Sequence, residues 1–95
     1  MKVTASIPWL RVADLERSRA FYEQGFGMDL LIDQGDCLLL GTGEGVYVGL
    51  CERPAPRDTP GLLLCFIDDN IEARTELLVA CGATAAVDRI LRGVR

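Results

Sequence analysis

Four cysteines are the side chains with the widest chemical scope in this sequence. Cys37, Cys51, Cys65 and Cys81 are spaced 14, 14 and 16 residues apart, and none of them forms the C-x-x-C pair typical of zinc and redox motifs. The spacing therefore predicts neither kind of site. We expect reduced thiols that behave as small, mostly buried hydrophobic side chains.

An acidic cluster formed by Asp68, Asp69 and Glu72 is a second candidate for chemistry, either as a metal site or as an acid–base pair. Asp69 and Glu72 also match a D-x-x-E capping pattern, in which the aspartate is the N-cap of a helix and the glutamate is its capping-box partner. We favour this structural interpretation, which explains two of the three acids without any reaction.

The chain contains no histidine. This absence removes the usual general base at neutral pH, the Ser–His and Cys–His nucleophile pairs and every histidine-ligated metal site. Gly41, Gly43 and Gly45 precede a predicted strand, whereas a phosphate-binding loop needs a helix N-terminus. We therefore expect no catalytic residue, no metal and no cofactor.

The composition is that of one folded domain spanning residues 1–95, with 49% hydrophobic and 25% charged residues. With 14 acidic and 10 basic residues and no basic run, the chain lacks the surface that nucleic-acid binding requires. The longest apolar run, Leu62 to Ile67, has six residues, far fewer than the roughly 18 that span a bilayer. We expect a cytoplasmic protein with no nucleic-acid or membrane partner.

The first half of the chain predicts the order βαβββ. Val3 to Val12 suits a strand, because Pro8 is disfavoured inside a helix and β-branched residues are frequent in this segment. Asp14 is the expected N-cap of a helix that ends at Gly25 and Gly27. Three short strands with hairpin-type turns between them follow, at residues 29–33, 37–40 and 45–51.

The second half predicts a partial repeat of the first. A linker at residues 52–60 contains three prolines. A strand at 62–67, a helix from Ile71 that ends at Gly82 and a last strand at 84–87 are expected after it. Residues 12–16 align with residues 67–72 when one residue is inserted, which predicts an internal repeat. Module one covers residues 1–54, and module two, residues 60–95, is expected to be incomplete by two strands, either as a natural short form or as a fragment of a longer protein.

The segment from Leu10 to Met28 reads L-R-V-x-D-L-x-R-S-x-x-F-Y-x-x-x-x-G-M. It resembles the opening module of the vicinal oxygen chelate superfamily, which includes glyoxalase I, bleomycin resistance proteins and extradiol dioxygenases. The start of the second module, Phe66 to Asp69, also matches. The resemblance implies an α+β fold of tandem βαβββ modules, each a half-barrel, that together enclose a pocket, with the second module incomplete here.

Metal-dependent members of this superfamily place a histidine or glutamine on the first strand of each module and a glutamate on the last strand. The corresponding positions are Ile7, Gly49 and Leu62, and the fourth lies beyond residue 95. None of the three residues present can bind a metal. The resemblance therefore implies a metal-independent protein of the bleomycin-resistance type, which sequesters a small toxic molecule and catalyses no reaction.

Strand alternation predicts which side chains face the pocket, if Leu10 and Val12 pack under the first helix. The expected ligand-binding residues form an apolar and aromatic surface with a single cation: Trp9, Arg11, Tyr47, Cys51, Leu64 and Phe66. Such a surface suits a small apolar or aromatic ligand that carries a negative charge. Arg11 also occupies the position that binds a glutathione carboxylate in glyoxalase I. A solvated Arg11 and purely structural aromatic residues are the alternatives.

Two further functions stay open. The chain is an enzyme of the glyoxalase, isomerase or dioxygenase type if Glu44, Glu52 or Cys51 has a shifted pKa inside the pocket. It is a non-catalytic dimerisation module if no ligand binds. Because members of the superfamily often build pockets across two subunits, and because an incomplete second module leaves a strand edge unpaired, we expect a homodimer.

Overall fold

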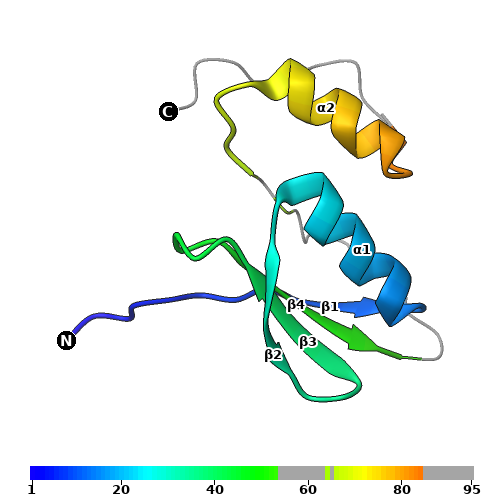
Figure 1. Cartoon of the computed structure of the whole chain (residues 1–95). Coiled ribbons are helices and arrows are strands. Elements are labelled where there is room, and N and C mark those ends of the chain that lie inside the picture. The colour runs from blue at the N-terminus through cyan, green and yellow to red at the C-terminus, as the bar shows by residue number, and fades with distance from the viewer. Residues whose placement is uncertain (54–63, 65, 85–95) are drawn as a thin grey trace.

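The computed structural model describes residues 1–53, 64 and 66–84, and these residues form a four-stranded sheet and two helices (Figure 1). The elements are β1 (Trp9–Val12), α1 (Leu15–Phe26), β2 (Asp29–Asp33), β3 (Cys37–Gly41), β4 (Tyr47–Glu52) and α2 (Ile71–Ala80). The strand order is β1-β4-β3-β2, with β1 parallel to β4 and the other neighbours antiparallel. The predicted α+β class and the βαβββ order of the first module are confirmed.

Helix α1 begins and ends on local signals. The Arg17 amide donates to the Asp14 carboxylate at 3.1 Å, so Asp14 is the N-cap, as predicted. At the other end Gly27 has a φ of 68°, and its amide donates to the Glu23 carbonyl at 3.1 Å. This left-handed conformation is open to glycine without strain and ends the helix. Gly25, by contrast, lies inside the helix and is buried.

The core lies between α1 and one face of the sheet (Figure 1). Alternate residues of the two central strands point to this face, and Leu40, Val48 and Leu50 have no exposed surface. Six residues form the buried cluster: Leu15, Met28, Leu38, Leu40, Val48 and Leu50. Leu10 and Val12 pack against this cluster, which confirms their predicted place under the first helix.

The first strand is shorter than predicted, because β1 covers only the last four residues of the expected segment Val3–Val12. Pairing with β4 starts where the Gly49 amide donates to the Pro8 carbonyl at 2.8 Å. β4 itself begins only two residues earlier, at Tyr47, so the preceding segment has no long partner strand among the described residues. A strand needs such a partner for its amides and carbonyls.

The start of helix α2 differs from the prediction by one residue. Asn70, not Asp69, is the N-cap, and its side chain accepts from the Ala73 amide at 3.1 Å. The neighbouring Asp68 accepts from the Asn70 amide at 2.9 Å and pairs with the Arg74 guanidinium at 2.6 Å. This turn places Asn70 where its side chain reaches the first turn of the helix. The D-x-x-E interpretation of Asp69 was therefore wrong.

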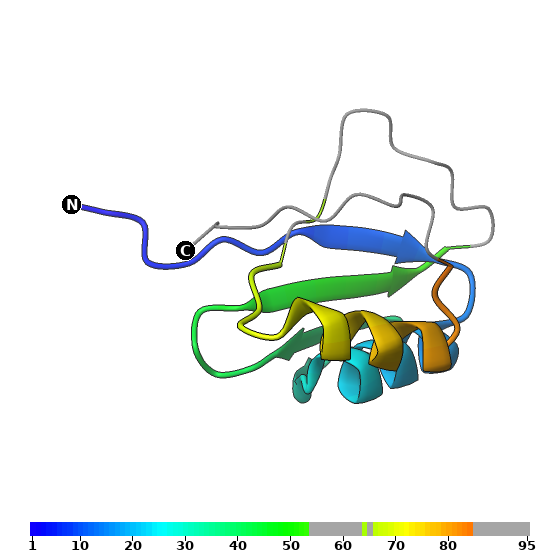
Figure 2. The ribbon, with the colours of Figure 1, turned by 90° about the horizontal axis from the view of Figure 1, so that it is seen from above.

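Helix α2 packs on α1, on the side of α1 away from the sheet, and it overlies α1 when the molecule is viewed from above (Figures 1 and 2). The two helices approach closely at Gly25, where an added Cβ would lie 2.8 Å from Leu78 Cδ2. Arg74 donates through Nη1 to the Gly25 carbonyl at 2.7 Å. One glycine therefore accounts for both the close packing and the polar contact between the helices.

The structure describes only part of the segment predicted to be a second module. Leu64, Phe66 and Ile67 belong to no strand, and the rest of the strands expected at 62–67 and 84–87 lies outside the described residues, as does most of the linker expected at 52–60. In the part of the chain that the structure describes, no helix combines the length and apolar character needed to cross a membrane.

Candidate functional site

The face of the sheet opposite α1 carries three of the predicted site residues. Trp9 pairs with Gly49 and Arg11 pairs with Cys51 in the parallel register of β1 and β4. Paired positions share a face of the sheet, so Trp9, Arg11 and Cys51 point away from the core. Trp9 is 49% exposed, and Arg11 is also exposed. We call this surface the open face.

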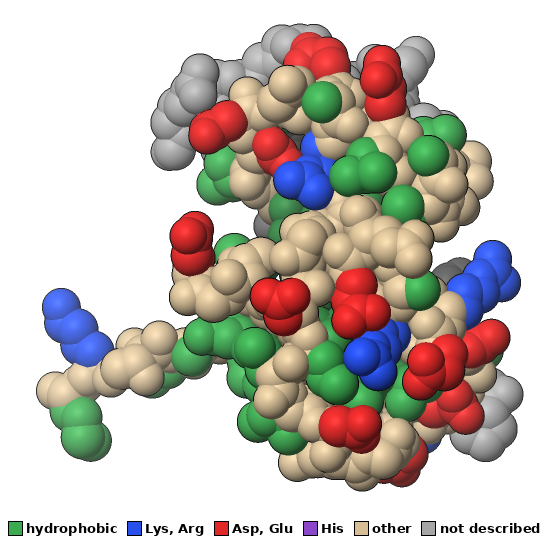
Figure 3. Space-filling model, in the orientation of Figure 1, with side chains coloured by type: hydrophobic (Ala, Val, Ile, Leu, Met, Phe, Trp, Pro, Cys, Tyr) green, Lys and Arg blue, Asp and Glu red, His purple; other side chains and the backbone are tan. Residues whose placement is uncertain are grey.

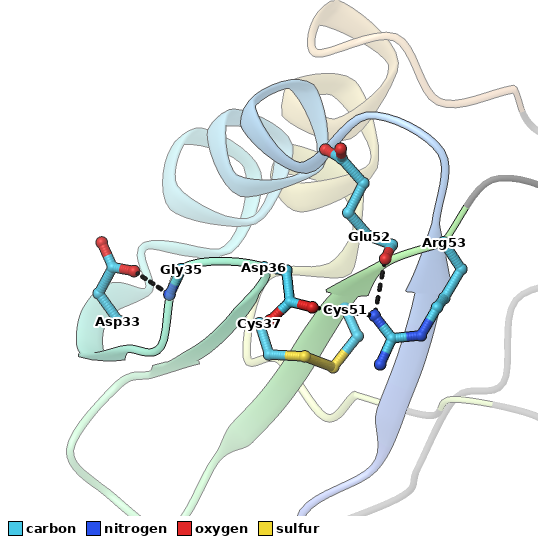
Figure 4. The surroundings of a disulfide bond; sticks show 7 residues. All are labelled: Asp33, Gly35, Asp36, Cys37, Cys51, Glu52 and Arg53. Carbon is cyan, nitrogen blue, oxygen red and sulfur yellow. Dashed lines mark hydrogen bonds and ion pairs between the residues drawn. A yellow bond between two sulfur atoms is a disulfide. The ribbon is translucent and has the colours of Figure 1, made fainter.

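A disulfide between Cys37 and Cys51 crosses the open face and joins β3 to β4 (Figure 4). The two cysteines are register partners on antiparallel strands, with their Cα atoms 4.1 Å apart. Directly opposed residues at such a short separation bring their sulfur atoms within bonding reach. The expectation of reduced thiols was wrong for this pair, and Cys51 presents no thiol for ligand binding or catalysis. Cys81 is free and half-buried.

Glu52, one of the groups considered for catalysis, serves the start of α1 instead. Its carboxylate accepts from the Leu15 amide at 2.9 Å, and Figure 4 shows the side chain extended toward that helix end. The first amides of a helix lack partners within the helix and favour a negative charge. Glu52 therefore ties the end of β4 to α1. The two residues are 37 positions apart, so local sequence reasoning missed this contact.

The two described positions to which the resemblance assigns metal ligands do not fit a metal. Ile7 and Gly49 offer no donor atom, and Leu62 lies outside the described residues. The Trp9 indole also covers Gly49 so closely that an added Cβ would overlap the ring. A glutamate therefore has no room at this position while Trp9 keeps its place. Within the described ranges, no three His, Cys, Asp or Glu residues gather to hold a metal ion.

A cavity of about 750 Å³ lies among the helices and the β3–β4 turn, and the other three predicted site residues form part of its wall. Tyr47, Leu64 and Phe66 line it, whereas Trp9, Arg11 and Cys51 do not. The described residues that line the cavity are mostly apolar or aromatic: Ser6, Pro8, Phe26, Met28, Thr42, Glu44, Gly45, Val46, Tyr47, Leu64, Phe66, Ile67, Asp68, Ile71, Arg74, Thr75 and Leu78. The predicted site is thus divided between two regions.

Stacked aromatic rings form one wall of the cavity. The ring centroids of Phe26 and Phe66 are 4.5 Å apart at an interplanar angle of 37°. Phe26 also stacks on Tyr22 at 5.6 Å, so the wall is anchored to α1. Phe66 keeps 37% of its surface exposed. Its ring is therefore available to a flat ligand.

Among the described residues that line the cavity, the one cation is Arg74, not the predicted Arg11. Arg74 donates through Nε to Asp68 at 2.6 Å and through Nη1 to the Gly25 carbonyl at 2.7 Å. The Asn70 amide and, after it, the Arg74 guanidinium lower the pKa of the Asp68 carboxyl below its usual value. The guanidinium is therefore already neutralised by a carboxylate that stays charged.

Several solved structures have a similar fold, among them the following three. The fosfomycin resistance protein FosX from Listeria monocytogenes matches 96% of this chain and 74% of its own, with 21% identity and a TM-score of 0.74. A possible glyoxalase from Bacillus cereus matches 81% and 69%, with 18% identity and a TM-score of 0.64. An integron cassette protein from the mobile metagenome of Halifax Harbour Sewage Outfall matches 83% and 71%, with 22% identity and a TM-score of 0.64.

These likenesses establish the fold alone, because all three identities are low. A comparison with curated proteins gave no match. The sequence profile of one family, however, matches residues 3–91, which is nearly the whole chain. The match agrees with the resemblance carried by the segment from Leu10 to Met28. The chain belongs to the Glyoxalase/Bleomycin resistance protein/Dioxygenase superfamily.

Proposed function

We propose that this protein binds and sequesters a small, largely apolar molecule without the help of a metal ion. Membership of the superfamily supports a fold that binds small molecules or acts on them. The observation that carries the proposal is the cavity of about 750 Å³, with the exposed ring of Phe66 in its wall. Its size and largely apolar lining are typical of sites for compact organic ligands.

Metal independence is supported by the residues at the family's ligand positions. Ile7 and Gly49 cannot donate an electron pair from their side chains, and the Trp9 indole occupies the space above Gly49. A Lewis-acid reaction at these positions would need at least three suitable donors on the protein. The sequence has no histidine to supply them.

The enzyme alternative is less well supported, since two of its three candidate groups have other roles. Cys51 is in the disulfide, and the Glu52 carboxylate binds the Leu15 amide. Glu44 remains, on the turn between β3 and β4. The alternative of a dimerisation module without a ligand predicts that no small molecule binds at all.

The open face lies beside a strand edge that could bind a second chain. Within the described part of the chain, β1 pairs on one side only, with β4, and Trp9 and Arg11 stand exposed beside that edge. An unpaired strand edge favours association with a second chain. We propose a homodimer in which Trp9 and Arg11 contact the ligand or the partner.

Native mass spectrometry of the protein as purified tests these proposals together. We expect a metal-free dimer with an additional small organic mass, which chelation with EDTA does not remove. The variant Phe66→Ala should lose that mass, whereas Leu77→Ala, an exposed residue of α2 outside the cavity, should keep it. A stoichiometric metal whose removal releases the ligand would overturn the proposal.

A further inference from the structure

The ionisable groups around the cavity leave an excess of negative charge. Among the described lining residues, Asp68 and Glu44 are acidic and Arg74 is basic. Asp68 and Arg74 neutralise each other through their 2.6 Å ion pair. Glu44 makes no ion pair with any residue that the structure describes. Of the described lining residues, an incoming ligand therefore meets one carboxylate without an ion-pair partner, and the only cation is already paired with Asp68.

Glu44 is held in place by its turn. Gly43 and Gly45 on either side of it both have a φ of 83°, which glycine adopts without strain. The Glu44 amide donates to the Thr42 hydroxyl at 3.3 Å, and Thr42 also lines the cavity. The turn thus fixes the backbone of Glu44 at the edge of the cavity while its side chain stays exposed.

Aromatic rings in the cavity wall add to this negative potential. Phe26, Phe66 and Tyr47 line the cavity, and the faces of such rings carry partial negative charge. Cations bind to ring faces, and anions are disfavoured there. The rings and the carboxylate therefore both favour a positively charged ligand. Figure 3 shows that Asp and Glu side chains predominate over Lys and Arg on the face it draws, where the outline is notched between α2 and the rest of the molecule.

We infer that the cavity prefers an organic cation, namely a flat aromatic molecule with a protonated amine, over a neutral or anionic molecule of the same shape. The ring system would lie against Phe66 and the ammonium group would face Glu44. This inference rests on the proposed function, because it assumes that the cavity binds a ligand. It replaces the anionic ligand expected from Arg11, since Arg11 does not line the cavity.

Three probes with one ring system test the inference: naphthalene bearing a methylammonium, a hydroxymethyl or a carboxylate group. Isothermal titration at pH 7 and low ionic strength should give the tightest binding for the ammonium probe, by about threefold or more over the neutral one. The carboxylate probe should bind most weakly. Added salt should reduce the difference between the charged probes.

Two variants and one control test which residues cause the preference for the ammonium probe. Glu44→Gln should weaken the ammonium probe by about two- to fivefold and leave the neutral probe unchanged. Phe66→Ala should weaken all three probes. Glu76→Gln removes an exposed carboxylate of α2 outside the cavity and should change nothing. Circular dichroism of each variant checks that it folds.

The outcomes separate the two levels of the proposal. Binding of the neutral or carboxylate probe as tight as that of the ammonium probe, or an unchanged preference in Glu44→Gln, would overturn the inference and leave the proposed function standing. No binding of any probe to the folded protein would overturn both. An ammonium preference that Glu44→Gln reduces and Glu76→Gln does not would support both.

Discussion

Helices α1 and α2 begin in the same way and lie in different surroundings. In each helix an Asp or Asn N-cap side chain accepts from the third amide beyond it, at 3.1 Å in both cases. α1 then buries Leu15 and Gly25, whereas α2 has no buried residue. The local start is therefore similar in the two helices. The difference lies in the described sheet, which α1 covers and α2 does not.

This difference explains where the cavity lies. α1 packs along the sheet, so the space beneath it is filled by Leu38, Leu40, Val48 and Leu50. α2 contacts α1 closely at Gly25, through Leu78 and Arg74. The space beyond that contact is bounded by α2, the end of α1 and the β3–β4 turn, and it is not filled by described side chains. Helix α2, which contacts α1 and not the described sheet, thus forms one side of the candidate site.

The largest expected effect on stability comes from truncating a core residue under α1, and we compare it with truncation of an exposed residue on α2. Leu40 has no exposed surface, so Leu40→Ala should lower the free energy of unfolding by about 2 to 5 kcal/mol, through lost apolar burial and a new cavity. Leu77 is 41% exposed, so Leu77→Ala should cost less than about 1 kcal/mol. Urea denaturation measures both. Equal losses would contradict the contrast between the two helices.

The disulfide should stabilise the sheet under α1. Its two cysteines are 14 residues apart, and closing a loop of that length is worth about 3 kcal/mol. Cys37→Ser combined with Cys51→Ser should lower the unfolding midpoint, and a reductant should have the same effect on the wild-type protein. Cys81→Ser serves as the control, because Cys81 is a free thiol. No change in the double variant would mean that the bond does not form in solution.

A methyl group at Gly25 should separate the two helices. Gly25→Ala places a Cβ 2.8 Å from Leu78 Cδ2, and overpacking of this kind costs about 1 to 3 kcal/mol. Adding Leu78→Ala should remove the clash and recover part of that loss. Hydrogen exchange in α2 should rise in the single variant while exchange in β3 and β4 stays slow. If the second change brings no recovery, the helices do not meet at this point.

The smallest expected effect is the loss, at acid pH, of the stability that the Asp68–Arg74 pair contributes. The pKa of Asp68 is lowered in the folded protein, chiefly by the Asn70 amide and next by Arg74. Its contribution to stability is therefore present above the unfolded pKa and is lost as the pH falls through the lower, folded value. Asp68→Asn should be less stable than wild type at pH 7, and this difference should shrink at acid pH. A stability difference that grows on acidification would contradict a lowered pKa of Asp68 in the folded protein.

Much of the first module was predictable because its signals are local or periodic. Asp14 caps α1 through a residue three positions away, and the core face alternates along the central strands as expected. The family follows from the segment Leu10–Met28, a single stretch of sequence. In each case the residues that make the structure are neighbours in the chain.

Two of the errors arose where residues far apart in the sequence determine the structure, and a third arose from competition between neighbouring side chains. The Cys37–Cys51 bond depends on the register of β3 against β4, and the use of Glu52 by the Leu15 amide depends on a contact across 37 positions. Asn70 rather than Asp69 caps α2 because Arg74 and the Asn70 amide both bind Asp68. Strand parity placed Trp9 and Tyr47 on one surface. It did not reveal that residues of α2 line the cavity.

The most direct test of the central claim is a methyl NMR titration of the folded protein with 2-naphthylmethanol in the presence of EDTA. A neutral probe tests binding without assuming the charge preference. We predict saturable shifts for the methyl groups of Met28, Ile71 and Leu78, which line the cavity. We predict none for Leu39, which lies on the open face because it pairs with Gly49 in the register of β3 and β4. Shifts confined to Leu39, or no shifts until a metal ion is added, would contradict a metal-independent site in this cavity.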